Sequence, residues 1–242
     1  MRWVLIALLP APLLLAACLG IRGGAKPPSP TATPRLSDPP FVPQEVEADD
    51  DPSLPGEYID LPQIYGGYYG NQNGPNTAAH RLGPIDYSAQ GLPPAGGPHW
   101  GSGACGTDPT RAPPDCGPVP WGVYRDPWPA ESLVHNMEHA GVIIWYNTSD
   151  EDTIDELESF AEEQLNQGKL IVLAPYPDME GDHIAITVWS RRDEFPASKY
   201  SDERLKRFID ALYCRFDPER FCPEGTGDLT VTAAGRYHPS AL

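Results

Sequence analysis

The sequence LVHNMEHAGVIIWYN, residues 133–147, joins two histidines to the most apolar strand-like run of the chain. It predicts a short helix that begins at Pro129 and is followed by a buried strand over residues 141–147. In this helix His135 and His139 are four residues apart, so they share one face and can both reach one metal ion. The alternative is that the imidazoles bond to backbone or pack on aromatic neighbours without any metal.

The elements after this stretch alternate between helical and strand periodicity. A helix is expected to begin at Ser149 or Asp150 and to end at Gly168, and a second one to begin at Ser201 and to end before Pro218. Between them lie two expected strands, residues 169–176 and 183–191, which the turn PDMEGD would join as a hairpin, and residues 229–233 suggest a last short strand.

The resulting order is strand, helix, strand, strand, helix, preceded by a long irregular N-terminal segment. This order predicts an α+β fold with a small sheet and helices on one of its faces. A ferredoxin-like arrangement is the closest simple match, and a thioredoxin-like one is the alternative.

The first 17 residues have the features of a secretory signal peptide. Arg2 is followed by an apolar run that ends at Ala17 and is too short to span a bilayer comfortably. The run ends in Leu-Ala-Ala-Cys, which resembles the bacterial lipobox and implies cleavage before Cys18 and lipidation of its thiol. We therefore expect a lipid anchor on the extracytoplasmic face of a bacterial membrane. Ordinary secretion after a small-residue site is the alternative.

Residues 18–55 are rich in proline, alanine and aspartate and show no apolar periodicity. Such a segment cannot bury enough apolar surface to fold, so it predicts a disordered tether. One globular domain is expected over residues 56–242, with its core at about residues 75–216.

Five cysteines support the expected location. Without Cys18 an even number remains, as is typical of an oxidising compartment. Of the three possible connectivities, the sequence-local one is favoured, which pairs Cys105 with Cys116 and Cys214 with Cys222. Neither pair has the C-x-x-C spacing of a redox site, so a structural role is expected.

The chain is strongly acidic, with a net charge of −17, or −18 once Arg2 is lost with the signal peptide. This charge disfavours nucleic acids and anionic membrane surfaces as partners of the domain. The sequence also lacks a phosphate loop, a dinucleotide-binding fingerprint and a G-x-S-x-G nucleophile elbow.

Further histidines are candidates to complete a metal site. The proline- and glycine-rich loop over residues 93–100 constrains the backbone just before His99, which can present it as a third ligand. His80 and His183 are spare candidates for which a structural role is favoured, and His238 lies in the C-terminal tail.

Five segments, PPxGGPHW, GVY, LVHNMEHAGVIIWY, APYP and IAITVW, occur in an order similar to that of the bacterial domain-of-unknown-function family 3105. Members of this family are secreted or membrane-attached, and no activity is established for them. The similarity covers about residues 75–212. The residues that carry over are His99, Tyr124, His135, Asn136, Glu138, His139 and Gly141.

The resemblance implies a polar site that packing alone does not explain. Its ligands for copper or zinc would be His99, His135 and His139, with Glu138 as a further ligand or an orienting group. Met137 would be a soft ligand if the metal is Cu(I), although its spacing from His135 favours a place in the core.

These observations predict a membrane-anchored extracytoplasmic lipoprotein with a copper or zinc site. The first alternative is a non-catalytic structural or interaction module of the cell envelope, with an unknown protein partner and with the histidines in a hydrogen-bond network. The second is a zinc hydrolase, because residues 135–139 match the H-x-x-E-H pattern with Glu138 as general base. A strand that starts at Gly141 leaves no room for the long helix of a zinc peptidase, so enzymatic activity is uncertain and less favoured.

Overall fold

A computed structural model describes residues 42–101 and 117–222, all of which belong to one compact unit, Pro34–Leu242. The signal peptide, Cys18, Cys105, Cys116, the strand expected over residues 229–233 and His238 lie outside the described residues. The described helices are α1 (Pro43–Glu47), α2 (Leu61–Tyr65), α3 (Ala130–Glu138), α4 (Glu151–Asn166) and α5 (Asp202–Leu212). The described strands are β1 (Glu57–Tyr58), β2 (Gly122–Val123), β3 (Val142–Asn147), β4 (Ile171–Pro175), β5 (His183–Val188) and β6 (Arg191–Pro196).

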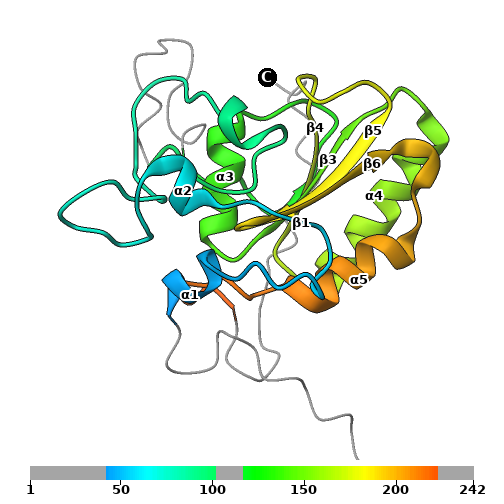
Figure 1. The fold of residues 1–242 in the computed structure, drawn as a ribbon. Coiled ribbons are helices and arrows are strands. Elements are labelled where there is room, and N and C mark those ends of the chain that lie inside the picture. The colour runs from blue at the N-terminus through cyan, green and yellow to red at the C-terminus, as the bar shows by residue number, and fades with distance from the viewer. Residues whose placement is uncertain (1–41, 102–116, 223–242) are drawn as a thin grey trace, which may run out of the picture. The chain divides into compact units, whose positions relative to one another are not determined.

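The strands of the described residues form one mixed sheet in the order β1-β6-β5-β3-β4-β2 (Figure 1). β3 lies inside the sheet, where Ile144 faces Leu173 of the parallel strand β4 and Ile186 of the antiparallel strand β5. The α+β class predicted from the sequence is thereby confirmed. In a ferredoxin-like sheet another strand separates the two strands that a crossover helix joins. Here α4 joins β3 to its direct neighbour β4, so the ferredoxin-like match is wrong.

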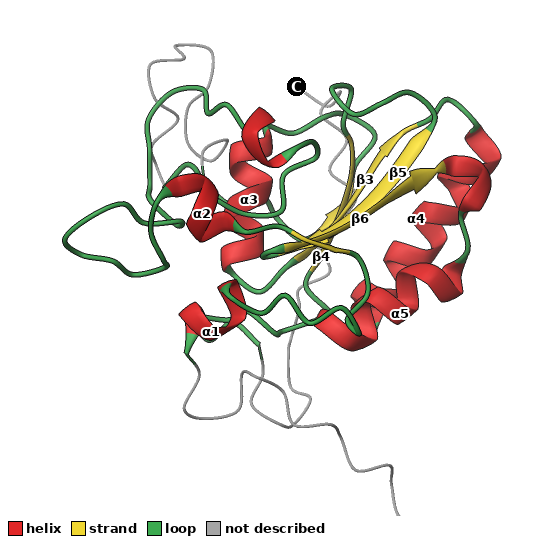
Figure 2. Ribbon diagram, in the orientation of Figure 1, coloured by secondary structure: helices red, strands yellow, loops and turns green. Residues whose placement is uncertain are grey.

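Helices cover both faces of the sheet, and not one face as expected (Figure 2). Successive residues of β3 point to opposite faces. Ile144 packs with Leu157 of α4 and Phe208 of α5, whereas Trp145 belongs to the cluster that contains Leu133 of α3. α3 and the segments that precede it in the chain form the layer on this second face of the sheet. This layer carries the candidate site.

The hairpin of the sheet is formed by β5 and β6, and the predicted hairpin of β4 and β5 is wrong, because β3 lies between those two strands. The run over residues 183–191 was expected to be one strand. It includes the turn at Trp189 and Ser190, both of which are buried, and Ser190 has a φ of 66°. A buried turn lacks the run of polar residues or glycines by which turns are recognised in a sequence. The sequence pattern therefore does not reveal β6.

The folded part begins before residue 56, in the segment expected to be tether. Val46 and Glu47 of α1 are 1% and 0% exposed. Further along, the Arg191 guanidinium donates hydrogen bonds to the carbonyl oxygens of Asp49 (2.8 Å) and Asp51 (3.0 Å). Residues 42–55 therefore contact the domain, and the disordered-tether prediction does not hold for them.

The helices α4 and α5 agree with the apolar periodicity of the sequence. α5 begins after Ser201, whose hydroxyl accepts a hydrogen bond from the Arg204 amide, and it ends at Leu212, earlier than expected. Within residues 42–101 and 117–222, no helix is both long enough and apolar enough to cross a bilayer.

Candidate metal centre

Helix α3 brings two polar side chains to one face and leaves its apolar side chains to the core. Its Leu133, Val134 and Met137 are at most 1% exposed and pack in the core cluster that contains Trp145 of the sheet. His135 and Glu138 are three residues apart, so they lie one above the other on an adjoining side of the helix. Met137 packs in the core, which is the position that its spacing favours.

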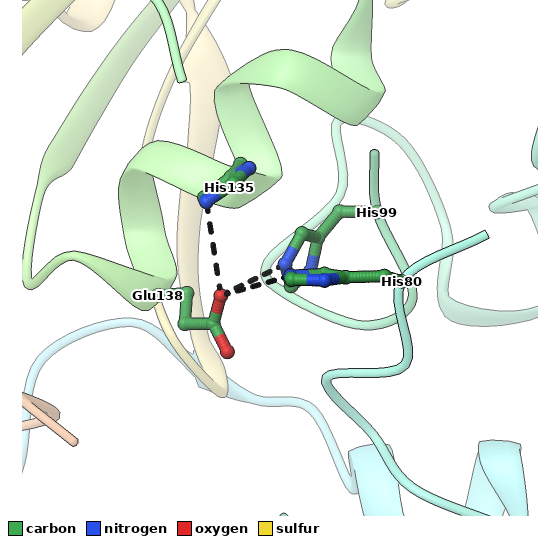
Figure 3. Close-up of side chains that lie close together, drawn as sticks. All are labelled: His80, His99, His135 and Glu138. Carbon is green, nitrogen blue, oxygen red and sulfur yellow. Dashed lines mark hydrogen bonds and ion pairs between the residues drawn. The ribbon is translucent and has the colours of Figure 1, made fainter. Parts of the chain in front are cut away.

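The side chains of His80, His99, His135 and Glu138 meet at one point, and we call them the His/Glu cluster (Figure 3). One ligand atom from each residue lies within 4.8 Å of all the others. The Oε2 atom of Glu138 is 2.9 Å from Nε2 of His99, 3.8 Å from Nε2 of His80 and 4.0 Å from Nε2 of His135. His99, His135 and Glu138 are buried, whereas the His80 side chain is 56% exposed.

Backbone pairing places His80 beside His99. The two residues form an isolated parallel bridge, in which the His99 amide donates to the Ala79 carbonyl (3.2 Å) and the Arg81 amide donates to the His99 carbonyl (2.8 Å). The ring centroids of the two histidines are 5.0 Å apart. His80 thus belongs to the cluster, although the sequence suggested only a spare candidate.

The loop before His99 depends on glycine. Gly97 has a φ of 111°, and a Cβ there would lie 2.8 Å from the Tyr65 ring. Its carbonyl oxygen is 2.9 Å from Nδ1 of His99. A carbonyl oxygen only accepts, so Nδ1 carries a proton. In the neutral ring Nε2 then presents a lone pair to the Glu138 carboxylate, and two such groups at 2.9 Å require a cation or a proton between them.

The ring of His135 is oriented in the same way. Its Nδ1 lies 2.5 Å from the carbonyl oxygen of Trp100 and donates to it, which directs the Nε2 lone pair into the cluster. Burial, followed by the charges of His99 and His139, lowers the pKa of His135 to about 3. The ring is therefore neutral near pH 7, as a metal ligand must be.

Glu138 is held as a carboxylate by its neighbours. Burial acts to raise its pKa, but the hydrogen bond from His99 and the charges of the surrounding histidines outweigh burial and lower it. On its other side lies Tyr69. Burial, the charges of Glu138 and Glu219, and a hydrogen bond to Glu138 raise the pKa of the Tyr69 hydroxyl, so this group remains a donor to the carboxylate.

His139 is the C-cap residue of α3 and is not a member of the His/Glu cluster. Its Nε2 lies 3.1 Å from Nε2 of His135 and 3.1 Å from Oε2 of Glu219, and its ring stacks on Phe221 with centroids 4.0 Å apart. Burial lowers the pKa of His139 to about 4. Glu219 and Tyr69 were not candidates in the sequence, since nothing in their local pattern marks them.

The remaining sequence candidates have structural contacts. Nδ1 of His183 lies 3.0 Å from Glu194 on the β5–β6 hairpin. A disulfide joins Cys214 to Cys222, as expected from their proximity in sequence. The expected partner bridge, Cys105 to Cys116, lies outside the described residues.

A family model described as "Protein of unknown function (DUF3105)" matches residues 79–224, which is more than half of the chain. The matched range includes the whole His/Glu cluster and the disulfide. No curated protein and no solved structure is significantly similar to the chain.

Proposed function

The chain belongs to the family DUF3105, and from the geometry of its His/Glu cluster we propose that it binds a transition-metal ion as an extracytoplasmic lipoprotein. The ligands in this proposal are His80, His99, His135 and Glu138. Sequence similarity assigns no activity to the family, so the proposal rests on the arrangement of these side chains.

The observation that carries the proposal is the orientation of the two buried imidazoles. His99 and His135 each donate Nδ1–H to a backbone carbonyl, which directs each Nε2 into the cluster, where it lies 2.9 Å from Glu138 Oε2 and 3.1 Å from His139 Nε2, respectively. An imidazole whose other nitrogen is fixed by a carbonyl is the usual form of a histidine ligand.

The spacing of the ligand atoms fits one ion. Metal–nitrogen and metal–oxygen bonds of about 2.0–2.2 Å in a tetrahedron give ligand–ligand distances of about 3.4 Å. The three distances from the Glu138 oxygen to the imidazole nitrogens are 2.9, 3.8 and 4.0 Å, which lie on both sides of this value. An ion can therefore be accommodated with small movements of the side chains.

The donor atoms favour Zn(II) or Cu(II) over Cu(I). Three imidazole nitrogens and one carboxylate oxygen contain no soft sulfur ligand, and Met137 packs in the core. At equal availability Cu(II) binds more tightly than Zn(II) to such a site, so the metal found in the cell depends on the supply of each.

The location is supported by the signal-like N-terminus and the lipobox-like residues before Cys18. The disulfide between Cys214 and Cys222 is also typical of a protein outside the reducing cytosol. Incorporation of labelled fatty acid that is lost in Cys18→Ser would support the anchor, and labelling that persists in this variant would contradict it.

Two observations bear on the alternatives. As a general base Glu138 would have to face a water molecule, whereas its Oε2 lies among three imidazole nitrogens, as a ligand would. In a structural module the side chains of the His/Glu cluster would make the same hydrogen bonds as in a metal-binding protein. The two alternatives therefore differ only in whether an ion binds.

Metal analysis of the full-length chain tests the proposal. We expect one tightly bound equivalent of Zn(II) or Cu(II) to survive dialysis, and to be lost in His99→Ala/His135→Ala. The matched control is His183→Ala, which removes a histidine outside the cluster and should keep the ion. A wild-type chain that retains no ion and gains no thermal stability from either metal would favour the structural module.

A further inference from the structure

A second group of ligand atoms adjoins the His/Glu cluster. One ligand atom from each of Glu138, His139 and Glu219 lies within 4.8 Å of the others. Glu138 is a member of both groups, and the Nε2 atoms of His135 and His139 are only 3.1 Å apart. The two groups therefore share the Glu138 carboxylate and lie directly beside each other.

The loop that presents Glu219 is built to hold it there. The Cys214–Cys222 disulfide closes the loop. Within it, the Asp217 carboxylate accepts hydrogen bonds from the amides of Phe221 (2.7 Å) and Cys222 (2.9 Å). The Phe221 ring stacks on His139, at an interplanar angle of 15°. The loop thus places the Glu219 carboxylate beside the His139 imidazole and packs the Phe221 ring on that imidazole.

The negative charges of Glu138 and Glu219 favour a bound cation. Within the part of the chain that the structure describes, neither Glu138 nor Glu219 forms an ion pair with a lysine or arginine. Their only ionic contacts there are with histidines. Two carboxylates that approach each other without a fixed positive charge repel, and a divalent cation between them removes the repulsion.

We infer that Glu138, His139 and Glu219 bind a second divalent transition-metal ion, with Glu138 as a carboxylate bridge to the first ion. This inference rests on the proposed function, since the bridge requires an ion in the His/Glu cluster. Carboxylate-bridged ions in proteins are about 3.5–4 Å apart. Three protein ligands leave at least one position of a four-coordinate ion for water or another exchangeable ligand.

The two positions differ in access. The first position has three buried ligands, His99, His135 and Glu138, besides the 56% exposed His80, whereas in the second the side chains of Glu219 and His139 are 43% and 12% exposed. With three ligands in place of four, and only one of them buried, the second ion binds more weakly than the first.

The test compares the full-length wild type with Glu219→Gln during titration with Cu(II). The number of bound ions comes from equilibrium dialysis, and their proximity comes from electron paramagnetic resonance, because two Cu(II) ions bridged by a carboxylate couple magnetically. The control is Glu156→Gln, the same change at an exposed position of α4.

We expect two ions per wild-type chain, with the signal of the first diminished when the second binds. In Glu219→Gln the first ion should remain, and the affinity for the second should fall at least about 10-fold. One ion in both proteins overturns the second site and leaves the proposed function standing, whereas no ion in either overturns both. Two uncoupled ions that Glu219→Gln does not affect also overturn the second site.

Discussion

Nδ1 of His135 donates to the carbonyl oxygen of Trp100, 35 residues earlier in the chain, at 2.5 Å. The bond joins α3 to the loop of His99 whether or not a metal is bound. In the presence of a chelator we therefore expect His135→Ala to lower the free energy of unfolding by about 1–3 kcal/mol, the cost of a buried unpaired acceptor. Urea denaturation measures this, with His183→Ala as the control that should change stability by less than about 1 kcal/mol. If His135→Ala and His183→Ala lowered the free energy of unfolding equally, the buried hydrogen bond would contribute little to stability.

The Tyr69 hydroxyl should matter to metal affinity more than to folding. Tyr69→Phe keeps the ring, which packs edge-on against Phe216, and removes the hydrogen bond that orients Glu138. We expect the affinity for the first ion to fall by about 10-fold or more, as is usual when the partner of a ligand is removed. Competition with a chromogenic chelator measures the affinity. A variant that binds as the wild type does would rule out this role.

Asn136 fastens the segment before β2 to α3. Its side chain accepts from the Val119 amide and donates to the Val119 carbonyl, both at 2.8 Å, and it is fully buried. Asn136→Ala leaves both backbone groups without partners, which predicts a loss of about 2–4 kcal/mol. Thermal denaturation checks the loss, with the exposed Asn166→Ala as a control expected within about 0.5 kcal/mol of the wild type.

Glu47 predicts a pH dependence of stability. Burial raises its pKa from 4.5 despite hydrogen bonds from Thr77, Tyr69 and Trp189. The folded state therefore holds a proton that the unfolded state releases, and this stabilisation is present below pH 4.5 and is lost as the pH rises through the raised pKa. In Glu47→Gln no proton is exchanged at this position. The stability of the wild type relative to Glu47→Gln should thus fall between pH 4.5 and neutral pH in urea titrations, and a constant difference would contradict the raised pKa.

The disulfide should stabilise the fold by an amount set by its short loop. Closure of a loop with a sequence separation of 8 predicts that Cys214→Ser/Cys222→Ser costs about 2–3 kcal/mol. Chemical denaturation of the variant and of the wild type with and without reductant checks this. A reduced wild type as stable as the oxidised one would show that the contacts of Asp217 alone hold the loop.

Strong periodicity made α4 and α5 predictable from the sequence. Leu205, Phe208 and Ile209 recur at helical spacing and are all buried, and Ser201 is a cap residue that the structure uses as one. β6 was not predictable in this way. Its buried Arg191 and Arg192 donate to carbonyl oxygens of residues distant in sequence. Their polar character gives no sign that the strand lies in the interior of the sheet.

The candidate site was predictable to the extent that its residues are close in sequence. His135 and Glu138 share a helix face by their spacing alone, and the constrained loop pointed to His99. His80 joins them through backbone pairing with His99 across 19 residues, for which periodicity gives no signal. His139 lies beside His135 as expected, with the two Nε2 atoms 3.1 Å apart. α3 nevertheless ends at Glu138, one residue earlier, and the contact of His139 with Glu219 was not predictable from the local sequence.

The uneven exposure of the His/Glu cluster has a kinetic consequence. His99 is enclosed on every side, while the His80 side chain is 56% exposed. Among the described ligands of this cluster, His80 is the one that solvent reaches, so an incoming ligand approaches an ion bound there from the side of His80. The ion would then be released by ligand substitution, in which an acceptor molecule replaces His80 before the bonds to the buried ligands break. The rate of release would therefore rise with the concentration of the acceptor. Such an ion would pass from one protein to another without ever being free in solution.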